Sequence, residues 1–139
     1  IASAYGLMAG YFQKTSQLDS AEYYYTRSLE MVRAKFPPLY PELAPPLVGL
    51  GSVLLQKKNA VTAEPLLREG LRIRTMRLPE GHSRIAHSQS LLGESLARQD
   101  KQEEAGFLLN AGYEGLKARY GEDHHLVKEA RERLNLLKN

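Results

Sequence analysis

Apolar and small residues recur along the chain at the spacing of a helix face, and short polar stretches interrupt them. The spacing i, i+3, i+4, i+7 places such residues on one side of a helix. It occurs in full at Tyr5, Met8, Ala9 and Phe12, and again at Leu47, Leu50, Gly51 and Leu54. The polar stretches 14–17, 56–59 and 98–101 divide the pattern into pairs of segments. The sequence therefore predicts an all-α fold of antiparallel helix pairs.

This pattern repeats every 42 residues. Ala21, Ala63 and Ala105 are separated by that interval, and residues 44–85 and 86–127 are identical at eleven of 42 positions. A fixed period of this length is typical of repeat proteins. We therefore predict about three repeats within residues 1–139, which we expect to form one domain. The repeats span 1–43, 44–85 and 86–127, and residues 128–139 form a capping helix.

Small residues at two fixed places in each repeat predict close helix packing. The two places hold Ala9, Gly51 and Gly93, and Ala21, Ala63 and Ala105. Two helices approach to about 8–10 Å only where their side chains permit it. A glycine inside a helix costs ~1 kcal/mol relative to alanine. We expect close packing to compensate for this cost, and these positions to be buried.

Proline residues predict where two of the helices begin. Pro45 and Pro46 place the start of the third helix near Leu43 or later. Pro65 is expected in the first turn of the fourth helix, where a missing N–H does little harm.

The alternation of small and large residues at positions 9, 12, 21 and 25, and at their equivalents, resembles the tetratricopeptide repeat (TPR) family. A 42-residue period alone also fits HEAT or armadillo repeats. Segments 21–25 and 63–71, and the loops that end at His82 and His124, resemble the kinesin-light-chain-like subtype. The resemblance implies a TPR α solenoid: a right-handed superhelical stack of helix pairs whose first helices line a concave groove.

The resemblance also implies which residues face that groove. Family members that clamp a terminal carboxylate use Asn with Lys or Arg, and kinesin-light-chain-like domains carry a ladder of paired Asn. No Asn stands at Gly6, Val48 or Ser90, so we predict neither arrangement. The candidate peptide-binding residues are Gln13, Lys14, Val48, Ser52, Leu55, Gln56, His87, Ser90, Glu94 and Arg98. The capping helix would add Glu129 and Glu132.

Composition narrows the range of partners and compartments. The formal net charge is only +3 with the signs mixed along the chain, which does not favour a nucleic-acid partner. No apolar run approaches the ~18 residues of a membrane span, and no signal peptide is recognisable. There is no cysteine, which suits a cytoplasmic location. Since the chain starts without Met and already reads as helix, we expect a fragment of a longer protein.

Two candidate sites suggest metal or acid–base chemistry, and each has a simpler interpretation. Residues 122–125 resemble metal ligands, but His82 occupies the place of His124 without acidic neighbours, which favours a helix N-cap at each. His87 lacks a partner in any catalytic motif and is expected to be a solvated groove residue. We predict no catalytic residue, no metal and no cofactor.

Two further groups could bind phosphate or bases. One group consists of the arginines of the fourth helix, but a run of this kind more often forms a solvated helix face, which we expect here. The arginines are Arg68, Arg72, Arg74 and Arg77. The other group is the tyrosine run 23–25, whose rings could stack on bases. We expect Tyr25 in the core, so that only Tyr23 is left without a packing role.

The favoured function is a protein–protein interaction module that holds another protein's peptide or helix in its groove, as a scaffold or adaptor. The alternative is a structural spacer or a self-associating, homo-oligomeric unit of a larger bacterial signalling protein. An enzyme is not expected.

Overall fold

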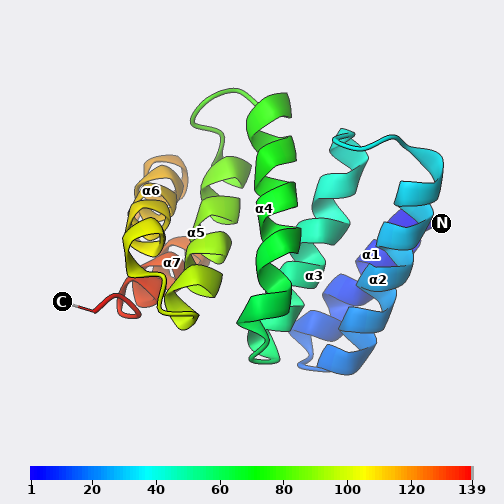
Figure 1. The fold of residues 1–139 in the computed structure, drawn as a ribbon, viewed down its shortest axis with the longest axis horizontal. Coiled ribbons are helices and arrows are strands. Elements are labelled where there is room, and N and C mark those ends of the chain that lie inside the picture. The colour runs from blue at the N-terminus through cyan, green and yellow to red at the C-terminus, as the bar shows by residue number, and fades with distance from the viewer. Residues whose placement is uncertain (139) are drawn as a thin grey trace. The chain divides into compact units, whose positions relative to one another are not determined.

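The computed structural model describes residues 1–138, and Asn139 lies outside the described residues. These residues form helices joined by short turns, with no β-strand among them (Figure 1). The helices are α1 (Ala2–Lys14), α2 (Leu18–Lys35), the short 3₁₀ helix η1 (Pro41–Leu43), α3 (Ala44–Gln56), α4 (Ala60–Arg77), α5 (Ser83–Arg98), α6 (Gln102–Tyr120) and α7 (His125–Leu134). The predicted all-α fold is confirmed.

The chain divides into two compact units. Unit 1 comprises Ile1–Ile73, and unit 2 comprises Arg74–Asn139, so the boundary falls near the end of α4. In unit 1, α2 packs against both α1 and α3. In unit 2, α6 packs against α5 and α7.

Two helix boundaries differ from the sequence-based expectation, and one agrees with it. Pro45 and Pro46 lie in the first turn of α3, as expected. Pro65 is instead the sixth residue of α4, counting from Ala60, so its predicted place in the first turn is wrong. The physical reason is that Asn59 starts the helix earlier, because its carbonyl accepts the N–H of Ala63. The terminal helix α7 begins at His125, three residues before the predicted position 128.

The small residues of unit 1 lie at close helix contacts. Ala9, Ala21 and Ala63 are fully buried. A Cβ atom added to Gly51 would lie 2.6 Å from Cγ of Leu67 on α4. This distance is shorter than any ordinary carbon contact, so only glycine fits there. The prediction that small residues mark the helix contacts is confirmed for this unit.

The same contacts recur in unit 2. Ala105 is fully buried, and a Cβ atom added to Gly93 would lie 2.7 Å from Cγ of Leu109. Gly112 of α6 faces the backbone of α5, because an added Cβ would lie 2.7 Å from both the carbonyl O of Ala86 and the N of Ser90. Backbone atoms cannot rotate away as a side chain can.

The turn inside each helix pair also repeats at the 42-residue period. Ser16, Lys58 and Asp100 each have a positive φ, between 61° and 67°. The N–H that follows each of them bonds back to a carbonyl near the end of the preceding helix, at Phe12, Leu54 and Leu96, over 2.8–2.9 Å. This is the six-to-one bond of a Schellman motif, which satisfies a terminal carbonyl and reverses the chain. The 42-residue repeat is therefore a repeat of backbone conformation as well as of side-chain size.

A pair of substitutions in α6 tests the glycine contacts. Gly112→Ala should lower the free energy of unfolding by about 1–3 kcal/mol, because the new methyl group overpacks against the backbone of α5. Gly106→Ala is the matched control: its nearest new contact would be 3.9 Å away, so it should raise stability by up to about 1 kcal/mol through helix propensity. Urea unfolding of both variants measures the difference. Equal effects at the two positions would contradict the packing argument.

Candidate functional site

An open cavity of about 940 Å³ lies in unit 1, between the N-terminal half of α1 and the start of α3. Residues of α2 form its floor. Most of the lining is apolar and includes Leu7, Met31, Val32, Phe36, Pro45 and Pro46. The lining also contains Ser3, Gly6 and Lys35. A cavity of this size and composition can bury a large apolar side chain of a ligand.

Tyr25 also lines this cavity. A Cβ atom added to Gly49 would lie 2.4–2.8 Å from the Tyr25 ring, so the ring of α2 fits against α3 only because residue 49 is glycine. The Tyr25 hydroxyl donates to Oε1 of Gln13 on α1 at 3.3 Å. Burial raises the pKa of Tyr25. The residue is half-buried, so it is both a core residue, as predicted, and a wall of the cavity.

Three of the predicted binding residues in unit 1 bond to one another. Nε2 of Gln13 donates to Oγ of Ser52 at 3.0 Å and to Oε1 of Gln56 at 2.6 Å. This polar ladder joins α1 to α3. Lys14, also predicted, is exposed. The side chains of Gln13, Ser52 and Gln56 therefore bond to one another rather than stand ready for a ligand. The cavity is the better candidate site.

Val48 and Leu55, both predicted to face the groove, are buried instead. The reason is that α3 is apolar around most of its circumference and is covered on several sides. Val48 packs closely against Gly70 of α4, since a Cβ atom on that glycine would lie 2.7 Å from Cγ2 of Val48. These two side chains therefore offer no exposed surface.

In unit 2, three predicted binding residues gather around Arg133 of α7. Its Nε donates to Oε1 of Glu94 at 2.9 Å, and its Nη1 donates to Oγ of Ser90 at 3.0 Å. The other carboxylate oxygen of Glu94 accepts from Nε of Arg98 at 2.8 Å. Ser90 is fully buried, and the Glu94 and Arg133 side chains are each only 13% exposed. Ser90 is thus not the exposed groove residue that was predicted.

Sequence reasoning missed Arg133. The groove-facing residues that it expected on the last helix were Glu129 and Glu132, and both are exposed. No repeated pattern in the sequence points to Arg133. Gln13 bonds residues 39 and 43 positions later, and Arg133 bonds residues 39 and 43 positions earlier. One long polar side chain therefore spans an i, i+4 pair on the neighbouring first helix in both units.

His87 is desolvated, and its predicted place among solvated groove residues is wrong. Burial is the main cause, and the positive charges of Arg133 and Arg74 and the nearby His125 add to it. Together they lower the pKa of His87 to about 4. The imidazole is therefore neutral at pH 7, and it can neither carry charge to an anionic ligand nor act as an efficient base near neutrality.

Three of the four arginines of α4 are exposed, as predicted for a solvated face, and Arg74 is the exception. Arg68 matches the expectation, because it is exposed and its Nε donates to Oε2 of Glu64, at 2.7 Å. Arg74 does not match it: Nη1 donates to Oγ of Ser88 at 2.9 Å. Burial and the charge of Arg84 lower the pKa of Arg74 to about 10.

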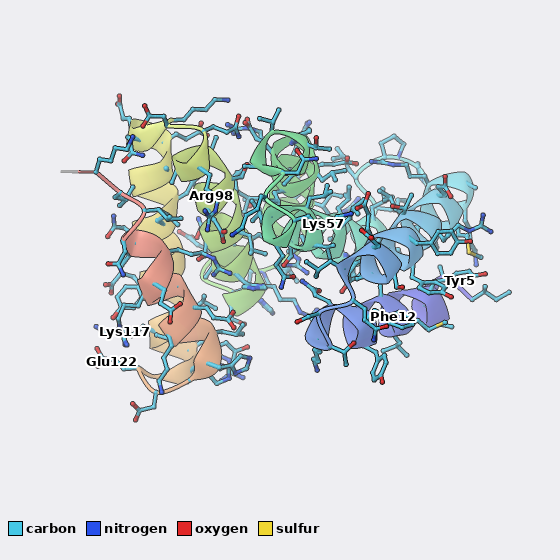
Figure 2. The ribbon with its side chains drawn as sticks, turned by 90° about the horizontal axis from the view of Figure 1, so that it is seen from below. Tyr5, Phe12, Lys57, Arg98, Lys117 and Glu122 are labelled. Carbon is cyan, nitrogen blue, oxygen red and sulfur yellow. The ribbon has the colours of Figure 1, made fainter. Side chains whose placement is uncertain are left out.

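His82 and His124 are helix N-caps, as predicted. Nδ1 of His82 accepts the N–H of Arg84, and Nδ1 of His124 accepts the N–H of Leu126, each at 3.1 Å. Nearby, Glu122 pairs with Lys117 at 3.4 Å (Figure 2). Within residues 1–138, no group of three or more His, Cys, Asp or Glu side chains is arranged to hold a metal ion.

The aromatic residues at the start of the chain stack on one another. Tyr24 of α2 stacks on Tyr5 and on Phe12, with ring centroids 5.7 and 5.5 Å apart, and Figure 2 shows both partners on α1. Tyr23 packs edge-on against Tyr24 and is exposed, so it is the spare ring of the run, as predicted.

The desolvation of His87 makes stability depend on pH. Between pH 6.5 and about 4 the unfolded chain binds a proton at His87 that the folded chain does not bind. The contribution of this group to stability is therefore complete above pH 6.5 and is lost as the pH falls toward 4. We expect a loss of about 1–3 kcal/mol from this group.

Urea unfolding of the protein and of His87→Gln across this pH range measures that contribution. Carboxylates titrate in both proteins, so the informative quantity is the difference between the two curves. The variant should lose less stability on acidification. Parallel curves would show that His87 titrates normally in the folded state.

Within the part of the chain that the structure describes, no helix is both long enough and apolar enough to cross a bilayer. A search of curated proteins gives no match. Among solved structures, 28 chains match. One is a crystal structure from Podosopora anserina, described as a kinesin light chain with nearly identical TPR-like repeats. It has a TM-score of 0.78 at 16% sequence identity, and the match covers 95% of this chain.

That likeness shows a shared fold, and this chain spans 63% of the length of that structure. At the level of sequence, the family described as Tetratricopeptide repeat matches residues 1–76. TPR repeats generally mediate protein–protein interaction, as non-catalytic modules. Because the match spans more than half of the residues, the chain belongs to the tetratricopeptide repeat family.

Proposed function

We propose that this chain is a protein-interaction module that binds a peptide or helix of a partner protein in the cavity of unit 1. The observation that carries the proposal is the cavity itself, about 940 Å³ and lined mainly by apolar side chains of α1, α2 and α3. A ligand that inserts a large apolar side chain there would gain affinity through the hydrophobic effect. The ligand would cover the exposed Leu7 and the half-buried Met31.

The charged residues around the cavity carry both signs. Lys35 and Glu42 line it together with the apolar side chains, and Ser3 and Ser28 supply hydroxyl groups. This mixture favours a ligand that combines an apolar anchor with flanking polar groups, rather than a strongly charged one. It gives no support to the binding of nucleic acid or of a membrane surface.

The other predicted binding residues take a supporting role in this proposal. Gln13, Ser52 and Gln56 hold the C-terminal ends of α1 and α3 together, outside the cavity. In unit 2, Glu94 pairs with Arg98 of its own helix and with Arg133 of α7, and the second of these pairs links α5 to α7.

We further propose a scaffold or adaptor role for this module within a longer cytoplasmic protein, with residues 1–139 acting as one domain. The mixed, modest net charge and the family's general role in protein–protein interaction support this proposal. Binding needs no metal or cofactor under this mechanism, because burial of apolar surface supplies the affinity.

Selection of peptides from a random library displayed on phage tests the cavity. The enriched peptides should share a large apolar residue. Their affinity, measured by fluorescence anisotropy, should fall about tenfold or more in Met31→Glu, since a ligand would then have to bury a carboxylate without a partner.

Met76→Glu is the matched control, because Met76 is exposed on α4 and does not line the cavity. It should leave the affinity unchanged. Circular dichroism confirms that both variants are folded. The proposal fails if no peptide is enriched, or if the two glutamate variants weaken binding equally.

A further inference from the structure

One arginine of unit 2 has no counter-charge. Arg74, in the last turn of α4, is half-buried, and only its Nη1 forms hydrogen bonds. It donates to Oγ of Ser88 at 2.9 Å and to the carbonyl O of Arg84 at 3.4 Å, and both acceptors are neutral. Within residues 1–138, no carboxylate pairs with Arg74 or with the exposed Arg84. Because burial of a charge is costly unless the charge is paired, an anion from outside the chain would stabilise this guanidinium.

Three side chains of unit 2 have hydrogen-bonding nitrogens that no described residue contacts. A guanidinium has donors on all three of its nitrogens, and those on Nε and Nη2 of Arg74 and on Nη2 of Arg133 are unbonded. Within the described part of the chain, neither ring nitrogen of His87 has a hydrogen-bond partner. Among the same residues, no side-chain nitrogen or oxygen is both fully buried and unbonded. These nitrogens therefore still touch solvent, and a ligand can reach them.

The three side chains converge on one side of α5. Arg74 bonds to residues 84 and 88 of this helix, and Arg133 of α7 bonds to residues 90 and 94. With about 3.6 residues per turn, His87 lies between these two pairs around the helix. Both arginines, and the nearby His125, help to lower the pKa of His87. The two guanidinium groups therefore flank the imidazole. We call Arg74, Arg84, His87 and Arg133 the α5 cluster.

The charge of the α5 cluster favours a ligand with two negative charges. One carboxylate, that of Glu94, bonds to Arg133, and it is shared with Arg98. Arg74 and Arg84 add two positive charges that no carboxylate offsets within residues 1–138. A phosphate monoester carries nearly two negative charges at neutral pH and offers several acceptor oxygens, so it can bond to donors from different helices at once. A single carboxylate would offset only one of the two positive charges.

We propose that the α5 cluster binds the phosphate group of a phosphorylated serine or threonine of a partner protein. The unbonded Nε and Nη2 of Arg74 form the bidentate contact that a guanidinium makes with a phosphate. The neutral imidazole of His87 donates its N–H without adding charge, and Arg84 attracts the anion from its exposed position. None of these residues lines the cavity of unit 1, so the phosphate site does not depend on the binding proposed there.

NMR spectroscopy of the histidine rings tests the site with inorganic phosphate and requires no partner protein. His87→Gln identifies the ring signal of His87. Phosphate at pH 7 should shift this signal in a saturable manner, while chloride at equal ionic strength should not, because chloride screens charges without bridging the donors. A signal that responds equally to both salts would overturn the proposal. Met31→Glu should bind phosphate normally even where it weakens peptide binding in the cavity, which separates this test from that of the proposed function.

Three variants assign the binding to the α5 cluster. Arg74→Gln should weaken phosphate binding about tenfold or more, since it removes the charge-assisted bidentate contact. Arg84→Gln should weaken it about two- to fivefold, and it leaves the fold intact because Arg84 is exposed. Arg72→Gln is the matched control: it removes another exposed arginine of α4 and should bind like the unchanged protein. Circular dichroism confirms folding. Equal weakening in all three variants would show a general effect of charge and overturn the site.

The pKa of His87 gives an independent readout. Burial and the neighbouring arginines hold this pKa at about 4 in the free protein. A bound anion would offset the charges of Arg74 and Arg133, so the pKa should rise in sulfate, which stays doubly charged throughout the titration. NMR titrations in sulfate and in chloride at equal ionic strength measure the difference, with Glu94 and His125 as the other titratable groups nearby. Identical pKa values in the two salts would place the anion away from His87 and overturn the site.

Degenerate peptides distinguish a phosphate ligand from a carboxylate ligand. Three libraries carry a fixed central phosphoserine, glutamate or serine between random flanking residues. The immobilised protein should retain the phosphoserine library about tenfold more than either of the others, and Arg74→Gln should abolish that preference. Equal retention of the phosphoserine and glutamate libraries would overturn the choice of phosphate. Equal retention of all three would overturn the proposed peptide ligand even if inorganic phosphate binds.

Discussion

Close approach between paired helices is the constraint on which the rest of this structure depends. At Gly51, Gly93 and Gly112 an added methyl group would lie within 2.6–2.7 Å of a neighbouring helix. Packing density in protein interiors leaves no room for such an overlap. Because the helices meet so closely, the residues beside these contacts are fixed in position. Leu67 and Leu109 fill the space on one side, and polar groups such as those of Gln13 and Arg133 come within hydrogen-bonding distance of a neighbouring first helix.

The repeats share their backbone geometry but differ in the chemistry of their side chains. The left-handed turn residue is Ser16, Lys58 or Asp100, and the bond it places is the same each time. The polar bonds between helices differ instead: Gln13 bonds two neutral side chains of the following first helix, whereas Arg133 stands at a different place in the repeat and bonds a carboxylate and a serine of the preceding first helix. Backbone contacts therefore define the scaffold, while side chains that do not touch those contacts are free to differ. Such freedom lets repeats of one family bind different partners.

The sequence was sufficient for the fold because period and residue size are local and repeated signals. Ala21, Ala63 and Ala105 identify the helix contacts without knowledge of any partner, and His82 and His124 identify the caps by their equivalent places. The site was harder to predict for a physical reason. The exposure of Ser90 depends on Gly112 of α6 and on a guanidinium 43 residues later, and the pKa of His87 depends on its burial and then on charges from α4 and α7. The start of α4 likewise depended on Asn59 rather than on Pro65. Periodicity carries none of this information.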